Sequence, residues 1–261
     1  MSQLRSIRDA LLPSMRQTAW PEHREQKTRF LASSIQSQIM AMHPIPVLCL
    51  ITVLCLILPS TRTLLAQHPD TTGWKDLFAV DLSNTVDAAG WTFEGRELIA
   101  KKHDTLWTKE SYGDFILDLE FKVAAEANSG IFLRSGDIKN TLAALEIQVH
   151  ENADGSKYGM VAALYDAMPP SKKAAKPTGE WNHFTITCKG PKLVVVFNGE
   201  TVIDANLDNW SEVGKNPDGT PNKFKKALKD FSRKGSIGLQ GLHGKAQAPV
   251  WYRNLKIKDL P

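Results

Sequence analysis

Apolar and polar residues alternate along much of the chain after Gly73, in short runs separated by glycine, proline and asparagine. The clearest run is Phe115–Val123, where every second residue is apolar, which is the period of a β-strand with one buried face. Asn198-Gly199 stands between two apolar runs and suits the positive φ angles of a type I′ hairpin turn. Many short strands with almost no helical periodicity predict an all-β sandwich.

The same pattern predicts further strands, at residues 77–80, 91–93, 98–101, 130–134, 160–164, 183–189, 193–197, 201–204, 236–240 and 251–258. Two longer polar segments, residues 165–179 and 206–235, interrupt these strands and are long enough to form walls of a ligand site. The basic cluster at residues 223–234 is interpreted as a solvated loop with one or two helical turns, rather than as a binding patch.

Residues 144–150 (ALEIQVH) are predicted to form a strand whose two faces differ. Three aliphatic side chains share the face that builds the core, and Glu146, Gln148 and His150 share the other. The three polar side chains would be roughly 6–7 Å apart from one to the next, within reach of one small molecule. An ordinary solvated face of a half-buried sheet is the competing interpretation.

The first part of the chain has the pattern of a targeting segment. An uninterrupted apolar run at residues 45–58 (IPVLCLITVLCLIL) has the length of a signal-peptide core and is short for a membrane span. Small and apolar residues follow it, so we expect cleavage near Ala66. Met40 or Met42 is an alternative start, and a retained anchor is the competing interpretation. The sequence thus predicts a leader over residues 1–66 and a periplasmic or secreted product.

Charge and cysteine content support the same division. Residues 1–66 carry seven basic and three acidic side chains, and the other 195 residues carry 25 of each, so the net charge of +4 belongs to the leader. A neutral domain at residues 67–261 has no nucleic-acid signature. Two of the three cysteines lie in the leader. Cys188 therefore forms no internal disulfide and is expected to be an inert thiol in the core.

Several other polar residues stand where a ligand could make contact. Arg134 ends a strand, and Gln240 and His243 lie in the segment 235–244, whose glycines permit close approach of the backbone. Arg253 interrupts an apolar final strand. An arginine there needs a partner, which can be a structural carboxylate or a ligand.

An ordered series of motifs resembles a known family. The motifs are Gly73-Trp74-Lys-Asp-Leu-Phe78, Ser129-Gly130-Ile-Phe-Leu-Arg134, Glu146-x-Gln148, Glu180-Trp181-Asn182, Phe197-Asn198-Gly199, Gly235-x-Ile237-Gly238-Leu239-Gln240-x-x-His243-Gly244 and Tyr252-Arg253-Asn254-Leu255. The chain is similar to the 3-keto-disaccharide hydrolase family (DUF1080), also called the 3-keto-glucoside 1,2-lyase and 3-keto-2-hydroxy-glucal hydratase domain. The resemblance covers about Gly73 to Leu260. It implies a concanavalin-like jelly roll of two antiparallel sheets, an exported bacterial protein, and action on sugars oxidised at C3. His150 departs from the family, where an aspartate is expected.

The residues can be tested against that chemistry independently. Ordinary glycosidases need two carboxylates, which laminarinase-like jelly rolls supply from one strand, whereas residues 144–150 offer only Glu146. In a 3-keto sugar the ketone acidifies the C2 proton, so one base can remove it and expel the C1 substituent before water adds. A non-catalytic carbohydrate-binding module and a glycoside hydrolase that pairs Glu146 with Asp166 are the alternatives.

The elimination needs a base, an acid and a group that stabilises the enolate. The candidates are Glu146 or His150 as base, His243 as acid, and Arg134 with Gln148 or Gln240 as enolate stabilisers. A divalent cation held by Glu146, His150 and His243 is an alternative electrophile, although no close-spaced metal motif supports it.

An oxidised sugar or glycoside is the expected small-molecule partner. Tyr165 and Trp181 could stack on a sugar face, although lone aromatic residues in a β-protein often pack in the core or at its rim. Gln148, Gln240 and Arg253 are the other candidate binding residues. A membrane is a partner only if the apolar segment is retained.

Overall fold

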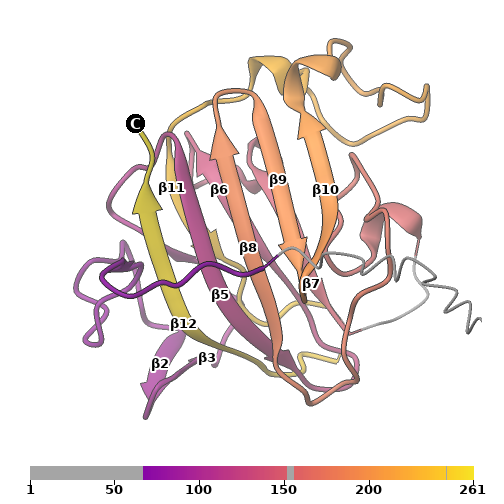
Figure 1. Ribbon diagram of the computed structural model, residues 1–261. Coiled ribbons are helices and arrows are strands. Elements are labelled where there is room, and N and C mark those ends of the chain that lie inside the picture. Colours follow the sequence, from indigo (N-terminus) through magenta and orange to yellow (C-terminus); the bar gives the residue numbers. More distant parts are fainter. Residues whose placement is uncertain (1–66, 152–155, 245) are drawn as a thin grey trace, which may run out of the picture. The chain divides into compact units, whose positions relative to one another are not determined.

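The computed structural model describes residues 67–151, 156–244 and 246–261, which belong to one compact unit. Two antiparallel β-sheets pack face to face, as Figure 1 shows, so the predicted jelly-roll sandwich is confirmed. The predicted leader, with its apolar run and cleavage position, lies outside the described residues. In the part of the chain that is described, no helix has the length and apolar character to cross a membrane.

The large sheet is built around β5 and β12, its two longest strands. In spatial order it contains β10 (Glu200–Asn206), β9 (Lys192–Phe197), β8 (Asn182–Lys189), β5 (Phe115–Val123), β12 (Val250–Asp259), β3 (Glu97–Ala100) and β2 (Trp91–Glu94), with β1 (Lys75–Asp76) pairing with β12.

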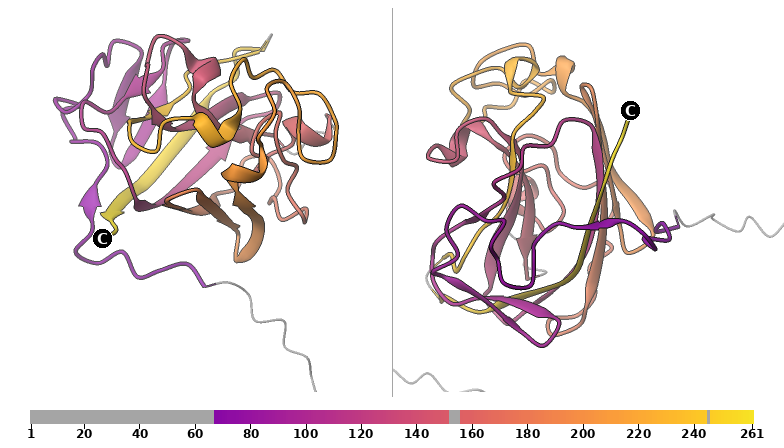
Figure 2. Two further views of the ribbon diagram at one scale, coloured as in Figure 1. Left: turned by 90° about the horizontal axis from the view of Figure 1, so that it is seen from above. Right: turned by 90° about the vertical axis from the view of Figure 1, so that its left-hand side faces the viewer.

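The small sheet lies behind it in Figure 1, and the right-hand view of Figure 2 shows the two sheets as layers. Its spatial order is β4 (Leu106–Trp107), β11 (Ser236–Leu239), β6 (Asn128–Ser135) and β7 (Leu145–His150). The helices of the described chain are single 3₁₀ turns, η1 (Thr141–Ala143), η2 (Lys157–Gly159), η3 (Leu207–Asn209) and η4 (Leu228–Asp230).

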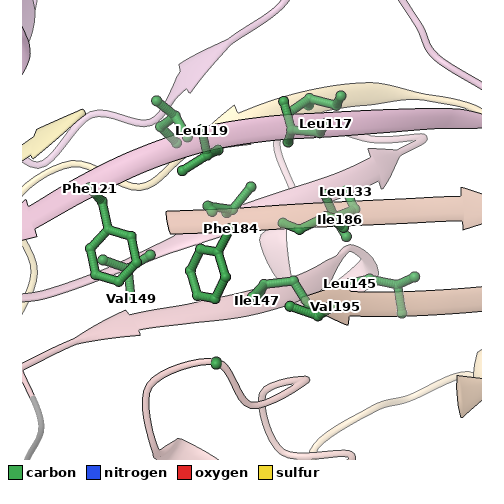
Figure 3. Close-up of a cluster of buried hydrophobic side chains, with 14 of the residues drawn as sticks. Leu117, Leu119, Phe121, Leu133, Leu145, Ile147, Val149, Phe184, Ile186 and Val195 are labelled. Carbon is green, nitrogen blue, oxygen red and sulfur yellow. The ribbon is translucent and has the colours of Figure 1, made fainter. Parts of the chain in front are cut away.

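Alternation along β5 builds the core as predicted. The five apolar side chains on its inner face are at most 3% exposed. Figure 3 shows Leu117, Leu119 and Phe121 among side chains of β8 and of the small sheet, including Ile147 and Val149 of β7. Each such side chain stabilises the fold by about 1.5–3 kcal/mol relative to an exposed one. Cys188 is also buried there, and burial raises the pKa of its thiol to about 12.

The hairpin between β9 and β10 has the predicted turn. Asn198 and Gly199 have φ values of +49° and +83°, so both central residues adopt the left-handed conformation of a type I′ turn. The Asn198 side chain also donates to Ala174 O at 2.7 Å and to Asn182 Oδ1 at 2.8 Å, which ties one long polar segment to the sheet.

Two predicted strands are wrong. Residues 77–80 form a bend instead, in which Leu77 is buried and donates its N–H to Leu255 O at 3.0 Å while Val80 is 80% exposed. Residues 160–164 are irregular apart from an isolated bridge at Leu164, because Ala162 has a φ of +68° and turns the chain. In both segments a run of apolar residues is buried through turns rather than through a strand.

Candidate active site

Strand β7 carries Glu146, Gln148 and His150 on the outer face of the small sheet, away from the core. This face is covered rather than solvated: Glu146 is 8% and Gln148 3% exposed, and His150 is half-buried. Polar side chains buried so deeply need polar partners, which must come from neighbouring segments.

The chain at residues 162–165 runs along the outer edge of β7. The N–H of Gln148 donates to Ala163 O at 3.0 Å, and the N–H of Tyr165 donates to Glu146 O at 2.9 Å. This pairing places Tyr165, a predicted substrate-binding residue, directly beside Glu146.

Lys223 reaches Glu146 from the second long polar segment. The Asp166 carboxylate accepts a hydrogen bond from the backbone N–H of Lys223 at 2.5 Å, which positions this residue. The Lys223 Nζ lies 3.7 Å from Glu146 Oε2 and 4.0 Å from the centroid of the Tyr165 ring. Interpretation of residues 223–234 as a solvated loop missed Lys223, whose contact with Glu146 has no signal in the spacing of the sequence.

Burial sets the charges of this group. Burial raises the pKa of the Glu146 carboxyl to about 7, and the positive charge of Lys223 opposes that rise. Burial also lowers the pKa of the Lys223 ammonium, against the attraction of Glu146 and Asp166, and raises the pKa of the Tyr165 phenol. Glu146 can therefore take up or release a proton near neutral pH.

Asn128 connects the other polar residues of this face. It pairs with His150 across β6 and β7 and forms an isolated bridge with His243. Its Oδ1 accepts a hydrogen bond from Gln148 Nε2 at 2.9 Å. Gln240, which directly follows β11, is half-buried and donates its backbone N–H to Gly130 O at 2.8 Å, whereas His243 is exposed. The fold thus brings three of the predicted residues to Asn128, which the sequence did not single out, and pairs Gln240 with the same strand.

The tautomer of the neutral His150 ring follows from its contact with the backbone. Its Nδ1 lies 2.7 Å from the carbonyl oxygen of Glu151, which can only accept a hydrogen bond. Nδ1 therefore carries the proton in the neutral ring, and Nε2 keeps a lone pair that can accept another.

Arg134 is not brought to this group. Its guanidinium is buried and donates to Gly113 O, Gly190 O and Asp114 Oδ1 at 2.7, 2.7 and 2.8 Å. Its central carbon lies 5.9 Å from the centroid of the Phe115 ring. Through these contacts the guanidinium joins loops at the end of the sandwich, so it does not contribute to the group of residues around Glu146.

Trp181 and Arg253 lie on the other side of the sandwich. Arg253 forms two hydrogen bonds to its cross-strand partner Glu120, at 3.0 and 3.1 Å, and its guanidinium lies 4.0 Å from the centroid of the Trp181 ring. Glu120 alternates with core residues along β5, so this cluster faces outward from the large sheet. The partner that Arg253 needs is a structural carboxylate.

The ligand set predicted for a divalent cation is not gathered by the fold. Among the residues that the structure describes, the ligand atoms of Glu146, His150 and His243 do not lie within 4.8 Å of one another. A different group on the outer face of the large sheet does, and consists of His68, Asp118 and His183. No spacing in the sequence indicates this group, because the pairing of β5 with β8 brings Asp118 and His183 together and His68 reaches them through contacts with Thr185 and Gly199.

The contacts within the His68 group are those of a hydrogen-bonded clip. His68 accepts the N–H of Gly199 at Nε2 (3.1 Å) and has Nδ1 2.8 Å from Thr185 Oγ1. Asp118 receives hydrogen bonds from His183 Nε2 at 2.8 Å and from Thr185 at 2.6 Å. The two imidazoles stack with centroids 3.5 Å apart and planes 11° apart. A metal lies in the ring plane at about 2.0 Å from each nitrogen, and two parallel stacked rings cannot both meet that condition.

Comparisons with known proteins agree with this fold. Residues 70–258 match a family described as the 3-keto-alpha-glucoside-1,2-lyase-like domain. A 3-keto-disaccharide hydrolase from Bacteroides thetaiotaomicron is 28% identical over 176 residues, which are 57% of this chain and 59% of that protein. The chain therefore matches less than two thirds of the length of this relative.

Solved structures from Parabacteroides distasonis are also similar. One, named as a candidate glycosyl hydrolase, is 34% identical with a TM-score of 0.68, covering 72% of this chain and 99% of that one. A second with the same description, 24% identical, has a TM-score of 0.55 over 72% of this chain and 84% of the other, and shares the fold.

Proposed function

We propose that this chain, which belongs to the family of 3-keto-alpha-glucoside-1,2-lyase-like domains, cleaves the glycosidic bond of 3-keto-glycosides by elimination followed by hydration. The observation that carries the proposal is Glu146: a carboxyl 8% exposed, with a pKa of about 7, whose Oε2 lies 3.7 Å from an ammonium group. A general base works best when its pKa is close to the working pH.

The reaction divides into two balanced steps. In the first, a base removes the C2 proton of the keto sugar, the electrons form an enolate on the C3 oxygen, and their return expels the C1 oxygen, which takes a proton. The product is an unsaturated 3-keto sugar with a C1–C2 double bond. In the second, water adds its oxygen to C1 and a proton returns to C2, so the net result is hydrolysis.

The site offers a group for each role. Glu146 is the base at C2, and the Lys223 ammonium stabilises the negative charge that develops on the C3 oxygen. Lys223 thereby takes the role that the sequence assigned to Arg134. Tyr165 is the proton donor to the leaving oxygen, whereas His150 accepts a hydrogen bond from a sugar hydroxyl at Nε2 and the amide of Gln148 contacts other hydroxyls.

A two-carboxylate glycosidase is less well supported. Asp166 is the candidate second carboxylate, and it accepts the backbone N–H of Lys223 at 2.5 Å. Its role is then to position Lys223. A non-catalytic sugar-binding module needs no group that changes its protonation near neutral pH, whereas burial raises the pKa of the Glu146 carboxyl to about 7.

Turnover of a chromogenic 3-keto-glucoside and of the matching unoxidised glucoside tests the proposal. We expect the chromophore to be released from the keto substrate and not from the unoxidised glucoside. Glu146→Gln should lower kcat by about 10²–10⁴-fold, and His150→Ala should reduce it, whereas Glu212→Gln, which changes an exposed ion-paired carboxylate, should not. Full activity in both site variants would contradict the assignment, and glycan binding without turnover of either substrate would establish a binding module.

Two further measurements separate the mechanisms. A substrate deuterated at C2 should react more slowly if that proton is removed in the rate-limiting step, and direct hydrolysis would show no such effect. Assays with and without a chelator address the cation: loss of activity on chelation would add a metal to the site.

Export is a separate part of the proposal, and rests on the apolar run at residues 45–58 and the small residues after it. We expect a mature protein that begins near Gln67 and is periplasmic or secreted. Fractionation of cells that express the full chain, with mass determination of the product, tests this expectation. A product that keeps residues 45–58 and sediments with membranes would indicate an anchor instead.

A further inference from the structure

Asn198-Gly199, the turn between β9 and β10, is a pair of residues at which a protein chain readily modifies itself. The backbone nitrogen of the glycine can attack Cγ of the asparagine side chain, and the approach is open because glycine has no Cβ. The attack forms a five-membered succinimide and releases ammonia, and water then opens the ring to aspartate or isoaspartate. The sequence contains no other Asn-Gly pair.

The attacking nitrogen is held by a histidine from the start of the described chain. Gly199 is buried, and its backbone N–H donates to His68 Nε2 at 3.1 Å. The attack requires this nitrogen to lose its proton and to approach Cγ, so the hydrogen bond opposes it. His68 is also a weak base for that proton, because burial and the nearby His183 lower the pKa of its imidazole to about 4.

The carboxamide of Asn198 is held by three hydrogen bonds. Its Nδ2 donates to Ala174 O at 2.7 Å and to Asn182 Oδ1 at 2.8 Å, and its Oδ1 accepts the N–H of His183 at 2.9 Å. Rotation of the side chain towards the backbone nitrogen would break these bonds. Both reacting groups are therefore fixed, and each is fixed by different residues.

Conversion of Asn198 to a carboxylate would remove a connection to the candidate active site. A carboxylate has no proton to donate, so the two oxygens that accept from the amide would face a negative charge instead. One of them belongs to Ala174, in the segment at residues 165–179. The same segment begins with Tyr165, which lies beside Glu146. Modification of the turn would thus release a wall of the site.

We propose that Asn198 is a self-modification site of this protein and that His68 controls it. Deamidation is suppressed while the imidazole binds Gly199 and proceeds when that contact is lost. The Gly199 nitrogen forms a bond to Cγ, the bond from Cγ to Nδ2 breaks, and ammonia leaves with the proton of the attacking nitrogen. Water then adds across one of the two C–N bonds of the ring. This inference is independent of the reaction that the Glu146 site catalyses.

Peptide mapping by mass spectrometry during incubation at pH 8 tests the proposal, because deamidation changes the mass of the peptide that contains Asn198. We expect the amide to persist in the unaltered protein, whereas a synthetic peptide of residues 192–206 should deamidate readily. His68→Ala should raise the rate in the folded protein by about 3- to 10-fold, the effect of one lost hydrogen bond. His103→Ala, which changes an exposed histidine, is the matched control.

A second control separates release of this contact from general loss of stability. Arg134→Met removes a guanidinium that binds Gly190 at the other end of β9 and leaves the contact of His68 in place. While folded, this variant should keep Asn198 as an amide. Equal rates in His68→Ala and the unaltered protein, equal rates in His68→Ala and Arg134→Met, or conversion of the unaltered protein as fast as the peptide would overturn the proposal.

The effect of the modification on the site wall has its own measurement. Asn198→Asp places one product of the reaction in the turn. Limited trypsin digestion should then cut the segment at residues 165–179, after its lysines, faster than in the unaltered protein, and this readout does not require turnover of any sugar. Equal digestion of both proteins would show that the amide of Asn198 does not hold this segment.

Discussion

The carboxylate of Glu146 lies over Gly130 of the neighbouring strand, so closely that a Cβ on Gly130 would be 2.3 Å from Glu146 Oε1. The two residues are diagonal neighbours, because Gly130 pairs with Gln148 and Glu146 with Phe132. The missing side chain therefore makes the space in which the carboxylate is buried beside Lys223.

Gly130→Ala should damage catalysis more than stability. The added methyl group must displace the Glu146 carboxylate, and a shift of about 1 Å in a reacting group can cost on the order of 100-fold in rate. We expect a loss of that size in kcat for a 3-keto-glucoside. Gly113→Ala is the control, since a Cβ there meets no atom within 4 Å. Unchanged kcat in Gly130→Ala would show that the carboxylate position is unimportant.

The pH dependence of kcat/KM should report Glu146. The base must be ionised, and its pKa is about 7, so activity should rise as the pH increases through 7 and level off above it. Lys223→Met removes a positive charge that lowers this pKa, so the rise should move to higher pH. Lys225→Met, which alters an exposed neighbour, should leave the profile in place. If Lys223→Met and the unaltered protein had the same pH profile, the charge of Lys223 would not act on the pKa of the base.

Local patterns predicted the sheet architecture, because they act over a few residues. The period of Phe115–Val123, the Asn198-Gly199 turn and the two faces of residues 145–150 each follow from backbone geometry that neighbours in sequence determine. The failures at residues 77–80 and 160–164 are apolar runs whose burial depends on distant partners, such as the bond from Leu77 to Leu255.

The candidate site could be predicted only in part, for a related reason. Strand alternation places Glu146 and Gln148 on one face, but nothing local indicates that Lys223 will cover them. The meeting depends on the bond between Asp166 and the Lys223 backbone, across 57 residues. Arg134 shows the converse: a motif can mark a residue whose charge is used entirely inside the scaffold.

Burial of the Glu146 charge should also appear in stability. Its pKa is raised from 4.5 to about 7 by folding, so between these values the folded protein holds a proton that the unfolded chain has lost. The free energy of unfolding therefore falls as the pH rises from 4.5 to 7. Glu146→Gln removes this dependence. The change that the substitution makes in the free energy of unfolding should therefore be more stabilising at pH 8 than at pH 5, by on the order of 2 kcal/mol. Urea unfolding at both pH values measures the difference, and a difference of zero would mean that Glu146 is solvated.

Arg134 should contribute to stability and not to catalysis. Its side chain is fully buried and its three donor groups bind Gly113, Gly190 and Asp114. Arg134→Met leaves these acceptors unpaired and should lower the free energy of unfolding by about 3 kcal/mol. At a temperature where the variant is folded, its kcat should match that of the unaltered protein. A selective loss of kcat in a stably folded variant would return Arg134 to the active site.

The clip formed by His68 should weaken as the pH falls. Burial, with the nearby His183, lowers the pKa of His68 from 6.5 to about 4. Between these values the unfolded chain takes up a proton that the folded protein excludes, so the contribution of His68 to stability is lost as the pH decreases from 6.5 towards 4. His68→Ala should lose about 1–2 kcal/mol at pH 7.5, where both hydrogen bonds of the ring are intact, and less at pH 5. Comparing the variant with the unaltered protein at each pH cancels the opposite effect of Glu146. His103→Ala, which changes an exposed histidine, is the matched control. A loss in His68→Ala that is the same at both pH values would mean that the imidazole does not titrate against folding.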